Sequence, residues 1–128
     1  MGKKYLIDTN TVIDLLANRF PDTATDWLES IIDNQEHCIS AINKIELLSY
    51  KGKIEEMSIL ETFIDTCEVL PITEKIVNST IQLRREKSTK LPDAVIAATV
   101  KEHGLVIITR NSKDFSHFFD NIIDPYKV

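Results

Sequence analysis

Acidic side chains stand next to several apolar segments of this chain. Asp8 comes directly after one apolar run and Asp93 directly precedes another. Asn111 and Asp114 follow a third. Unpaired carboxylates that converge repel one another, by about 3 kcal/mol per pair at roughly 5 Å and an effective dielectric constant near 20. A divalent cation relieves that repulsion, and sites built from carboxylate oxygens suit Mg²⁺ or Mn²⁺ rather than zinc.

Each of these polar residues also has an ordinary structural explanation. Aspartate is a good helix N-cap, so Asp8 could cap the helix that follows it. Asp93 could complement the dipole of its helix, and Asn111 and Asp114 are usual in turns. Glu46 lies on the flank of an apolar stripe, where it could simply be solvated. A capping carboxylate can also bind a metal, so these explanations do not exclude a site.

Short apolar runs alternate with stretches of helical periodicity along the chain. Strands are expected at 4–7, 37–40, 68–72, 105–109 and 122–123. Helices are expected at 9–17, from 22 or 23 through 32, and at 40–50, 54–64, 73–87 and 91–103, with a short helical turn within 112–119. This order predicts an α/β fold, a three-layer α/β/α sandwich with a central, mostly parallel sheet in one domain over residues 1–128. The carboxyl ends of such strands share one edge, where ligands bind.

Apolar spacing also assigns a buried face to each helix. Gly104 is expected to end the helix that begins at 91. Cys38 and Cys67 are too few for a zinc site or a disulfide scaffold and are expected to be reduced core residues. The expected inward residues are Ala41, Ile45 and Leu48 in helix 40–50, Ile59, Leu60, Phe63 and Ile64 in helix 54–64, and Ile76, Val77, Thr80, Ile81 and Leu83 in helix 73–87.

The charge of the chain argues against a simple nucleic-acid binder. The net charge is −5, from 15 basic and 20 acidic residues, whereas such binders are usually basic. An RNA partner would therefore need a metal ion or a local concentration of basic residues. No segment resembles a signal peptide or a membrane span, so we expect a cytoplasmic protein without a membrane partner. The candidate RNA-binding residues are Arg84, Arg85, Lys87, Lys90 and Arg110, although the stretch 84–90 could also be a solvated helix end favoured by the helix dipole.

Four segments, in order, resemble the PIN-domain family and, within it, the VapC-type toxins of toxin–antitoxin pairs. They are YLIDTN (5–10), the glutamate of SAINKIELLSY (40–50), LPDAVIAATV (91–100) and IITRNSKDF (107–115). The resemblance implies a parallel sheet flanked by helices, and Mg²⁺- or Mn²⁺-dependent endonucleolytic cleavage of RNA. It also implies a homodimer and an antitoxin that inhibits by occupying the groove.

The resemblance also assigns roles to individual residues. Asp8, Glu46 and Asp93 correspond to the first three acids of the family. The fourth is Asp114, or Asn111 at the position where the family carries Asp or Asn. The acids would hold the ion in a carboxylate cage that Asp114 completes with help from Asn111. Thr9 and Thr109 resemble hydroxyl residues that orient carboxylates or water. An activated water would attack phosphorus in line and leave 5′-phosphate and 3′-hydroxyl ends.

Three other interpretations use the same residues. A phosphatase of the haloacid-dehalogenase type needs a second acid where Asn10 stands. A receiver-like signalling domain needs a phospho-acceptor at a mid-chain strand end and a lysine after a later strand, and we cannot place both. The non-enzymatic alternative is a catalytically degenerate PIN-like binding scaffold.

Overall fold

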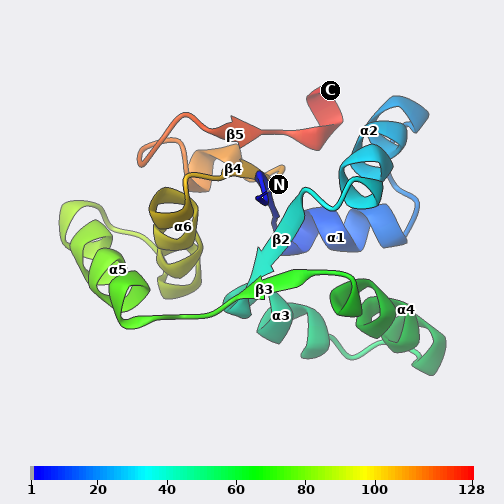
Figure 1. The fold of residues 1–128 in the computed structure, drawn as a ribbon, viewed down its shortest axis with the longest axis horizontal. Helices are drawn as coiled ribbons and strands as arrows, with labels where there is room; N and C mark the ends of the chain where they lie inside the picture. Colours follow the sequence, from blue (N-terminus) through cyan, green and yellow to red (C-terminus); the bar gives the residue numbers. More distant parts are fainter. Residues whose placement is uncertain (1) are drawn as a thin grey trace.

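A computed structural model describes residues 2–128, which are built around a five-stranded sheet (Figure 1). The strands pair in the order β3-β2-β1-β4-β5, and every pair is parallel. The predicted α/β class is confirmed, and the sheet is entirely parallel. The strands are β1 (Tyr5–Ile7), β2 (His37–Ser40), β3 (Glu68–Leu70), β4 (Val106–Ile108) and β5 (Ile122–Ile123).

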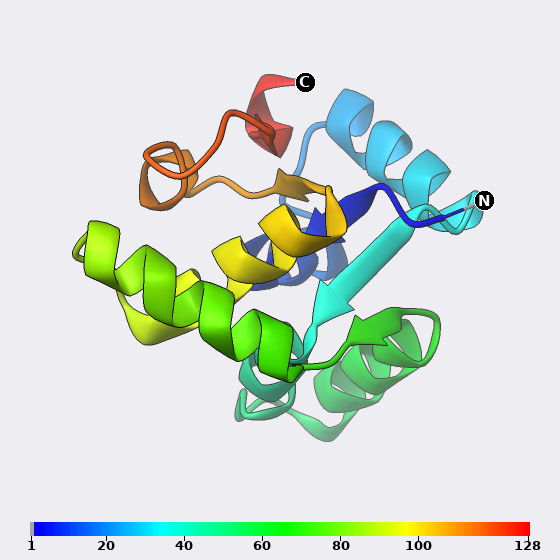
Figure 2. The ribbon, with the colours of Figure 1, turned by 60° about the vertical axis from the view of Figure 1, so that its left-hand side comes forward.

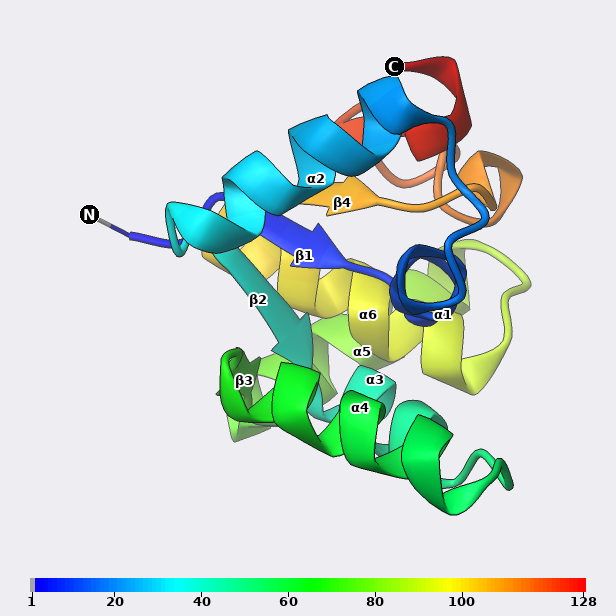
Figure 3. The same cartoon turned by 90° about the vertical axis from the view of Figure 1, so that its right-hand side faces the viewer.

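Helices cover both faces of this sheet, as the two turned views show (Figures 2 and 3). They are α1 (Thr9–Leu16), α2 (Asp22–Asp33), α3 (Ala41–Leu48), α4 (Ile54–Asp65), α5 (Glu74–Glu86) and α6 (Leu91–His103). Short 3₁₀ turns follow at Ser112–Asp114 and Pro125–Lys127. No helix within residues 2–128 is long and apolar enough to cross a lipid bilayer.

Two apolar cores lie on opposite faces of the sheet, because successive strand residues point to opposite sides. Leu6 and Ile107 belong to the core beneath α5 and α6, whereas Ile7 and Ile108 belong to the core beneath α1, α2 and α4. Helix α6 lies between the sheet and α5 (Figure 1) and is buried along residues 94–100. Its nearly all-apolar sequence follows from that position.

The predicted buried face of α3 is wrong. Ile45 and Leu48 are 59% and 38% exposed, and Asn43 and Leu47 are buried instead. The reason is that α3 buries the polar side chain of Asn43, and the spacing of apolar residues does not predict a buried polar residue. Similar errors occur within the longer helices, where Ile59 in α4 and Val77 and Ile81 in α5 were predicted to face inward and are exposed.

Neither cysteine forms a disulfide, as predicted. Cys38 is fully buried in the core beneath α5 and α6, and Cys67 is half-buried at the edge of the core on the opposite face. Burial raises the pKa of the Cys38 thiol to about 12 and that of the Cys67 thiol to about 11. Both thiols therefore stay protonated and unreactive near neutral pH.

Gly104 ends α6 with a positive φ of 63°, as predicted. Because a side chain in this left-handed conformation is strained, we expect Gly104→Ala to lower the free energy of unfolding by about 1 kcal/mol. Urea unfolding followed by circular dichroism measures the change. Gly2→Ala is the matched control, since nothing lies within 4 Å of either position and Gly2 has no positive φ. Equal stability of the two variants would contradict the prediction.

Candidate active site

The predicted site residues meet at the carboxyl ends of β1 and β4. Asp8 follows β1 and Thr109 follows β4, and chain order reverses between these neighbouring strands. Parallel α/β sheets form a crevice at such a point. The hollow found there is lined by Asp8, Glu46, Asp93 and Asn111, together with Thr9, Asn10, Ile13, Asp14, Arg19, Ile96 and Arg110. Asp114 lines an adjoining hollow, which it shares with Asp93.

Asp8 is a buried carboxylate, and each of its two oxygens accepts two hydrogen bonds. Its Oδ1 accepts from the backbone N–H of Thr9 at 2.9 Å and from the amide of Asn43 at 3.2 Å. Its Oδ2 accepts from the hydroxyl of Thr109 at 2.8 Å and from the amide of Asn10 at 3.2 Å. Asp8 therefore caps α1 and also lines the hollow, so its capping role leaves a role in the site open.

Glu46 is exposed on α3, but its carboxylate is tied to the start of α1. The hydroxyl of Thr9 donates to Glu46 Oε1 at 2.8 Å and accepts from the amide of Asn43 at 3.0 Å. Thr9 thus links the acid on α3 to the residues that hold Asp8. This hydrogen bond joins residues 37 apart in the sequence. It holds the exposed carboxylate of Glu46 beside the hollow.

The electrostatics of the hollow show that its carboxylates converge. Burial raises the pKa of Asp8, hydrogen bonds from Thr109 and Thr9 oppose this, and the negative charge of Glu46 raises the pKa further. Burial also raises the pKa of Asp93, and the negative charges of Asp114 and Asp8 add to the effect. A nearby cation would favour the ionised form of each group.

The donor set fits a hard divalent cation, although the closed cage predicted from the sequence is not found. Within residues 2–128, no three acidic, histidine or cysteine side chains are close enough to enclose a metal ion. Mg²⁺ usually keeps several water ligands and binds through one or two carboxylates. Asp8 and Asp93 suit that role, since burial raises the pKa of both and neighbouring negative charges add to the effect, from Glu46 at Asp8 and from Asp114 and Asp8 at Asp93. The residues fit an open, partly hydrated site.

Basic side chains flank the carboxylates on two sides. Arg110 lines the main hollow, and Lys90 lines the adjoining one beside Asp93. The sequence analysis did not name Lys113 and His117, which line that second hollow as well. The other predicted RNA-binding residues, Arg84, Arg85 and Lys87, line a further hollow that shares Ser88 and Thr89 with it.

Three more site residues were missed by sequence reasoning. Asn10 and Asn43 hold Asp8, and buried Asp14 lines the same hollow. A local signal did exist for Asn43, because its side chain and that of Ser40 exchange backbone hydrogen bonds in a capping box. Asp14 was harder to find, because only Arg19 among its partners is close in the sequence, while Arg110 and Tyr126 are distant.

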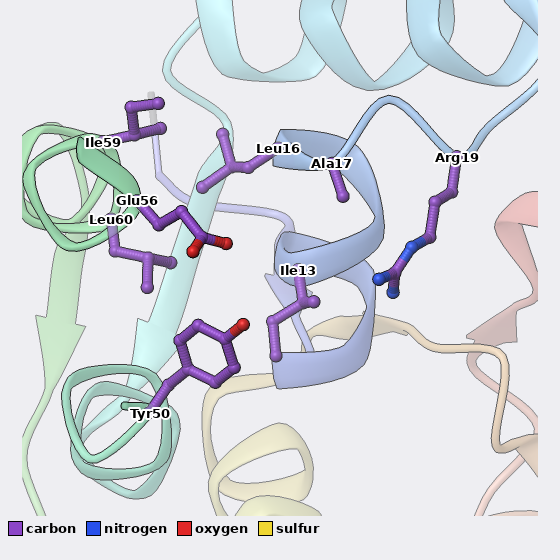
Figure 4. Close-up of a pocket in the computed structure, with 8 residues that line it drawn as sticks. All are labelled: Ile13, Leu16, Ala17, Arg19, Tyr50, Glu56, Ile59 and Leu60. Carbon is purple, nitrogen blue, oxygen red and sulfur yellow. The ribbon is translucent and has the colours of Figure 1, made fainter. Parts of the chain in front are cut away.

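An apolar hollow adjoins the acidic one (Figure 4). It lies between α1 and α4, and the side chains of Tyr50 and Glu56 reach into it. Ile13 and Arg19 line both hollows, so the two are continuous around α1. The remaining lining residues are Leu16, Ala17, Ile59 and Leu60.

Comparison with known proteins identifies the family of this arrangement. The family model described as PIN domain matches residues 5–119. This chain is a PIN domain. The PIN domain is 30% identical to the tRNA(fMet)-specific endonuclease VapC of Salmonella typhimurium, over 88% of this chain and 89% of the relative. It is 31% identical to Toxin FitB of Neisseria gonorrhoeae, over 86% of this chain and 89% of that toxin.

A solved structure shares the fold of this PIN domain over its whole length. It is a toxin–antitoxin complex from Klebsiella pneumoniae, with a TM-score of 0.77 and 29% identity. The match covers 98% of this chain and 100% of the other. The PIN domain therefore belongs to the VapC and FitB toxin family, and the resemblance seen in the sequence is confirmed.

Because the pKa of Asp93 is raised, we expect the substitution Asp93→Asn to increase the free energy of unfolding by an amount that depends on pH. A folded carboxyl group with a raised pKa destabilises the fold as pH rises from its usual value of 3.8 through its folded value. Without divalent cations, Asp93→Asn should therefore be more stable than the wild type at neutral pH. The difference should shrink as pH falls toward 3.8.

Urea unfolding in EDTA across this pH range measures the effect. Mg²⁺ should stabilise the wild type more than the Asp93→Asn variant, because a ligand that binds the folded state stabilises it. Asp120→Asn, a change at an exposed loop residue, is the control and should show neither effect. A less stable Asp93→Asn in EDTA at neutral pH would contradict the prediction.

Proposed function

We propose that this PIN domain is a Mg²⁺- or Mn²⁺-dependent endoribonuclease and the toxin of a toxin–antitoxin pair. The observation that carries the proposal is the convergence of Asp8, Glu46, Asp93 and Asp114 at the switch point of a parallel sheet. The names of the Salmonella endonuclease and the Neisseria toxin support it. The acidic chain would meet RNA through the metal ion and the flanking basic residues.

In this proposal, Asp8, Glu46 and Asp93 would hold the ion directly or through water, and Asp114 would complete the site with help from Asn111. When bound, the ion lowers the pKa of a water and stabilises the leaving oxygen of the phosphodiester. Thr109 and the two asparagine amides donate to Asp8 and hold it in one orientation. Thr9 orients Glu46.

The fourth acid and the RNA contacts follow from the same geometry. We assign Asp114 as the fourth acid, because its charge acts on Asp93, while Asn111 adds a neutral oxygen to the hollow. Lys90 and Arg110 contact phosphates next to the carboxylates. Arg84, Arg85 and Lys87 extend the basic surface beyond Lys90.

The proposal predicts RNA cleavage that needs a metal ion and Asp93. Purified protein should cut a mixed RNA pool with Mg²⁺ or Mn²⁺, leaving 5′-phosphate ends, and EDTA should stop the reaction. Asp93→Asn should slow cleavage by about a hundredfold or more, as expected when a charge-stabilising group at a reaction centre is removed. Asp65→Asn, at the exposed end of α4, is the matched control and should retain full activity.

Three outcomes would count against the proposal. Cleavage that survives EDTA would refute the metal mechanism, and cleavage that survives Asp93→Asn would refute the role of the acids. A protein that binds RNA but cleaves none under any metal condition would favour the scaffold alternative.

We also propose an antitoxin partner for the apolar hollow between α1 and α4. The Klebsiella structure is named as a toxin–antitoxin complex, and the apolar hollow adjoins the acidic one around α1. A segment bound there could reach the carboxylates and block them. Homodimerisation and a cytoplasmic location, which the sequence analysis expected, stay predictions.

The partner proposal can be tested by growth rescue. Expression of the wild type should arrest bacterial growth, and genomic fragments from the source organism can be selected for rescue. Ile59→Lys, at a 51% exposed position in the hollow, should still arrest growth but resist rescue. Ile81→Lys, at a 46% exposed position on α5, is the matched control and should be rescued. Equal rescue of both variants would place the partner elsewhere.

A further inference from the structure

Asp14 is a buried carboxylate that the carboxylate site does not use. It lies on α1, is 1% exposed, and accepts three charged or phenolic donors. Its Oδ1 accepts from Arg19 Nη1 at 2.9 Å, and its Oδ2 from Arg110 Nη1 at 2.9 Å and from the Tyr126 hydroxyl at 2.8 Å. We call these four residues the Asp14 clamp.

The Asp14 clamp presents positive charge at the surface. The side chains of Arg19 and Arg110 are 58% and 49% exposed, whereas the one carboxylate between them is buried. Each guanidinium carries five N–H donors, so most of them remain for a ligand. Within residues 2–128, Asp14 is the only carboxylate within 4.0 Å of either guanidinium.

Both arginines of the clamp lie at the carboxylate hollow. Arg19 and Arg110 line it together with Asp8, Glu46 and Asp93. Figure 4 shows Arg19 on the side of α1 that faces away from α4, although Arg19 also lines the apolar hollow. Asp14 comes six residues after Asp8 in the sequence, about 9 Å along the helix axis at 1.5 Å per residue.

The backbone around the clamp is connected to Asp8. Arg110 directly follows Thr109, whose hydroxyl donates to Asp8. The N–H of Arg110 donates to Asn10 Oδ1 at 3.4 Å, and the amide of Asn10 donates to Asp8. The guanidinium of Arg110 therefore has a defined position relative to the carboxylates.

We propose that the Asp14 clamp binds the phosphate next to the one that is cleaved, an inference that rests on the proposed ribonuclease function. Arginine binds phosphate through paired N–H donors, and a guanidinium held in place loses little conformational entropy on binding. Asp14 is a positioning residue, because it holds the two arginines and does not touch the RNA. Tyr126, whose ring packs 4.5 Å from that of Phe20, keeps the carboxylate covered.

The direction in which Asp14→Asn changes RNA binding distinguishes a positioning role from an effect of overall charge. Asp14→Asn removes a negative charge from a protein of net charge −5, which by general electrostatics should strengthen RNA binding. The clamp predicts weaker binding instead, because an amide holds two guanidiniums less firmly than a carboxylate. The probe is a short, fluorescein-labelled, mixed-sequence single-stranded RNA, and its anisotropy is measured with Mg²⁺ in an Asp93→Asn background, in which cleavage should be slow.

We expect Arg110→Gln and Asp14→Asn each to weaken binding of this RNA by about three- to tenfold. Arg110→Gln should also lower the slope of log K against log salt concentration by about 0.7, the value for one phosphate contact on a single strand. Lys4→Gln is the control for loss of one positive charge, because Lys4 pairs with Glu36 before β1 begins, and should barely change binding. In the active protein, Arg110→Gln should raise KM more than it lowers kcat.

Three results would overturn the clamp. The first is RNA binding by Asp14→Asn that is equal to or tighter than in the parent. The second is a further loss when Asp14→Asn is added to Arg19→Gln and Arg110→Gln together, since a positioning residue has no effect without the groups it positions. The third is an unchanged salt slope in Arg110→Gln. If Asp14→Asn does not fold, RNA binding by Arg19→Gln and Arg110→Gln alone tests the clamp. Both substitutions are at half-exposed positions.

Failure of the clamp is distinguishable from failure of the proposed function. If the wild type cleaves RNA with a metal ion and these variants bind RNA normally, only the clamp is wrong. If the wild type neither binds nor cleaves RNA, the ribonuclease proposal and the clamp are both wrong.

Discussion

The buried charge of Asp8 is the constraint on which the rest of the site depends. A carboxylate that is 6% exposed costs several kcal/mol unless donors replace the water it has lost. Those donors are Thr9, Asn10, Asn43 and Thr109. They begin α1 and α3 and end β4, so satisfying this one group fixes how those elements meet at the sheet.

The distribution of charge matters more than its sum in this protein. The chain is acidic overall, yet the groups nearest the acids include Lys90 and Arg110. Asp14 is acidic too, but burial hides its charge while it holds two arginines at the surface. Net charge is therefore a poor guide to the partner of a site whose field is set locally.

Most of the fold and part of the site could be predicted from residues that lie close together in the sequence. The strand runs and Gly104 at the end of α6 depend on neighbouring residues, so the sequence predicts them. The inward face of α3 was missed because Asn43 is buried for its hydrogen bonds rather than its apolarity. Asp14 was not singled out from the sequence, because its partners Arg110 and Tyr126 lie 96 and 112 residues away.

The pairing of β1 with β4 has a consequence for how the protein is made. Asp8 and Thr109 are 101 residues apart, so one donor of the central carboxylate is synthesised long after the acid itself. Until residues 106–126 emerge from the ribosome, β1 has no neighbour on one side and Asp14 lacks two partners. Contacts between such distant segments form late. The order of translation thus leaves the carboxylate site incomplete until β4 has left the ribosome.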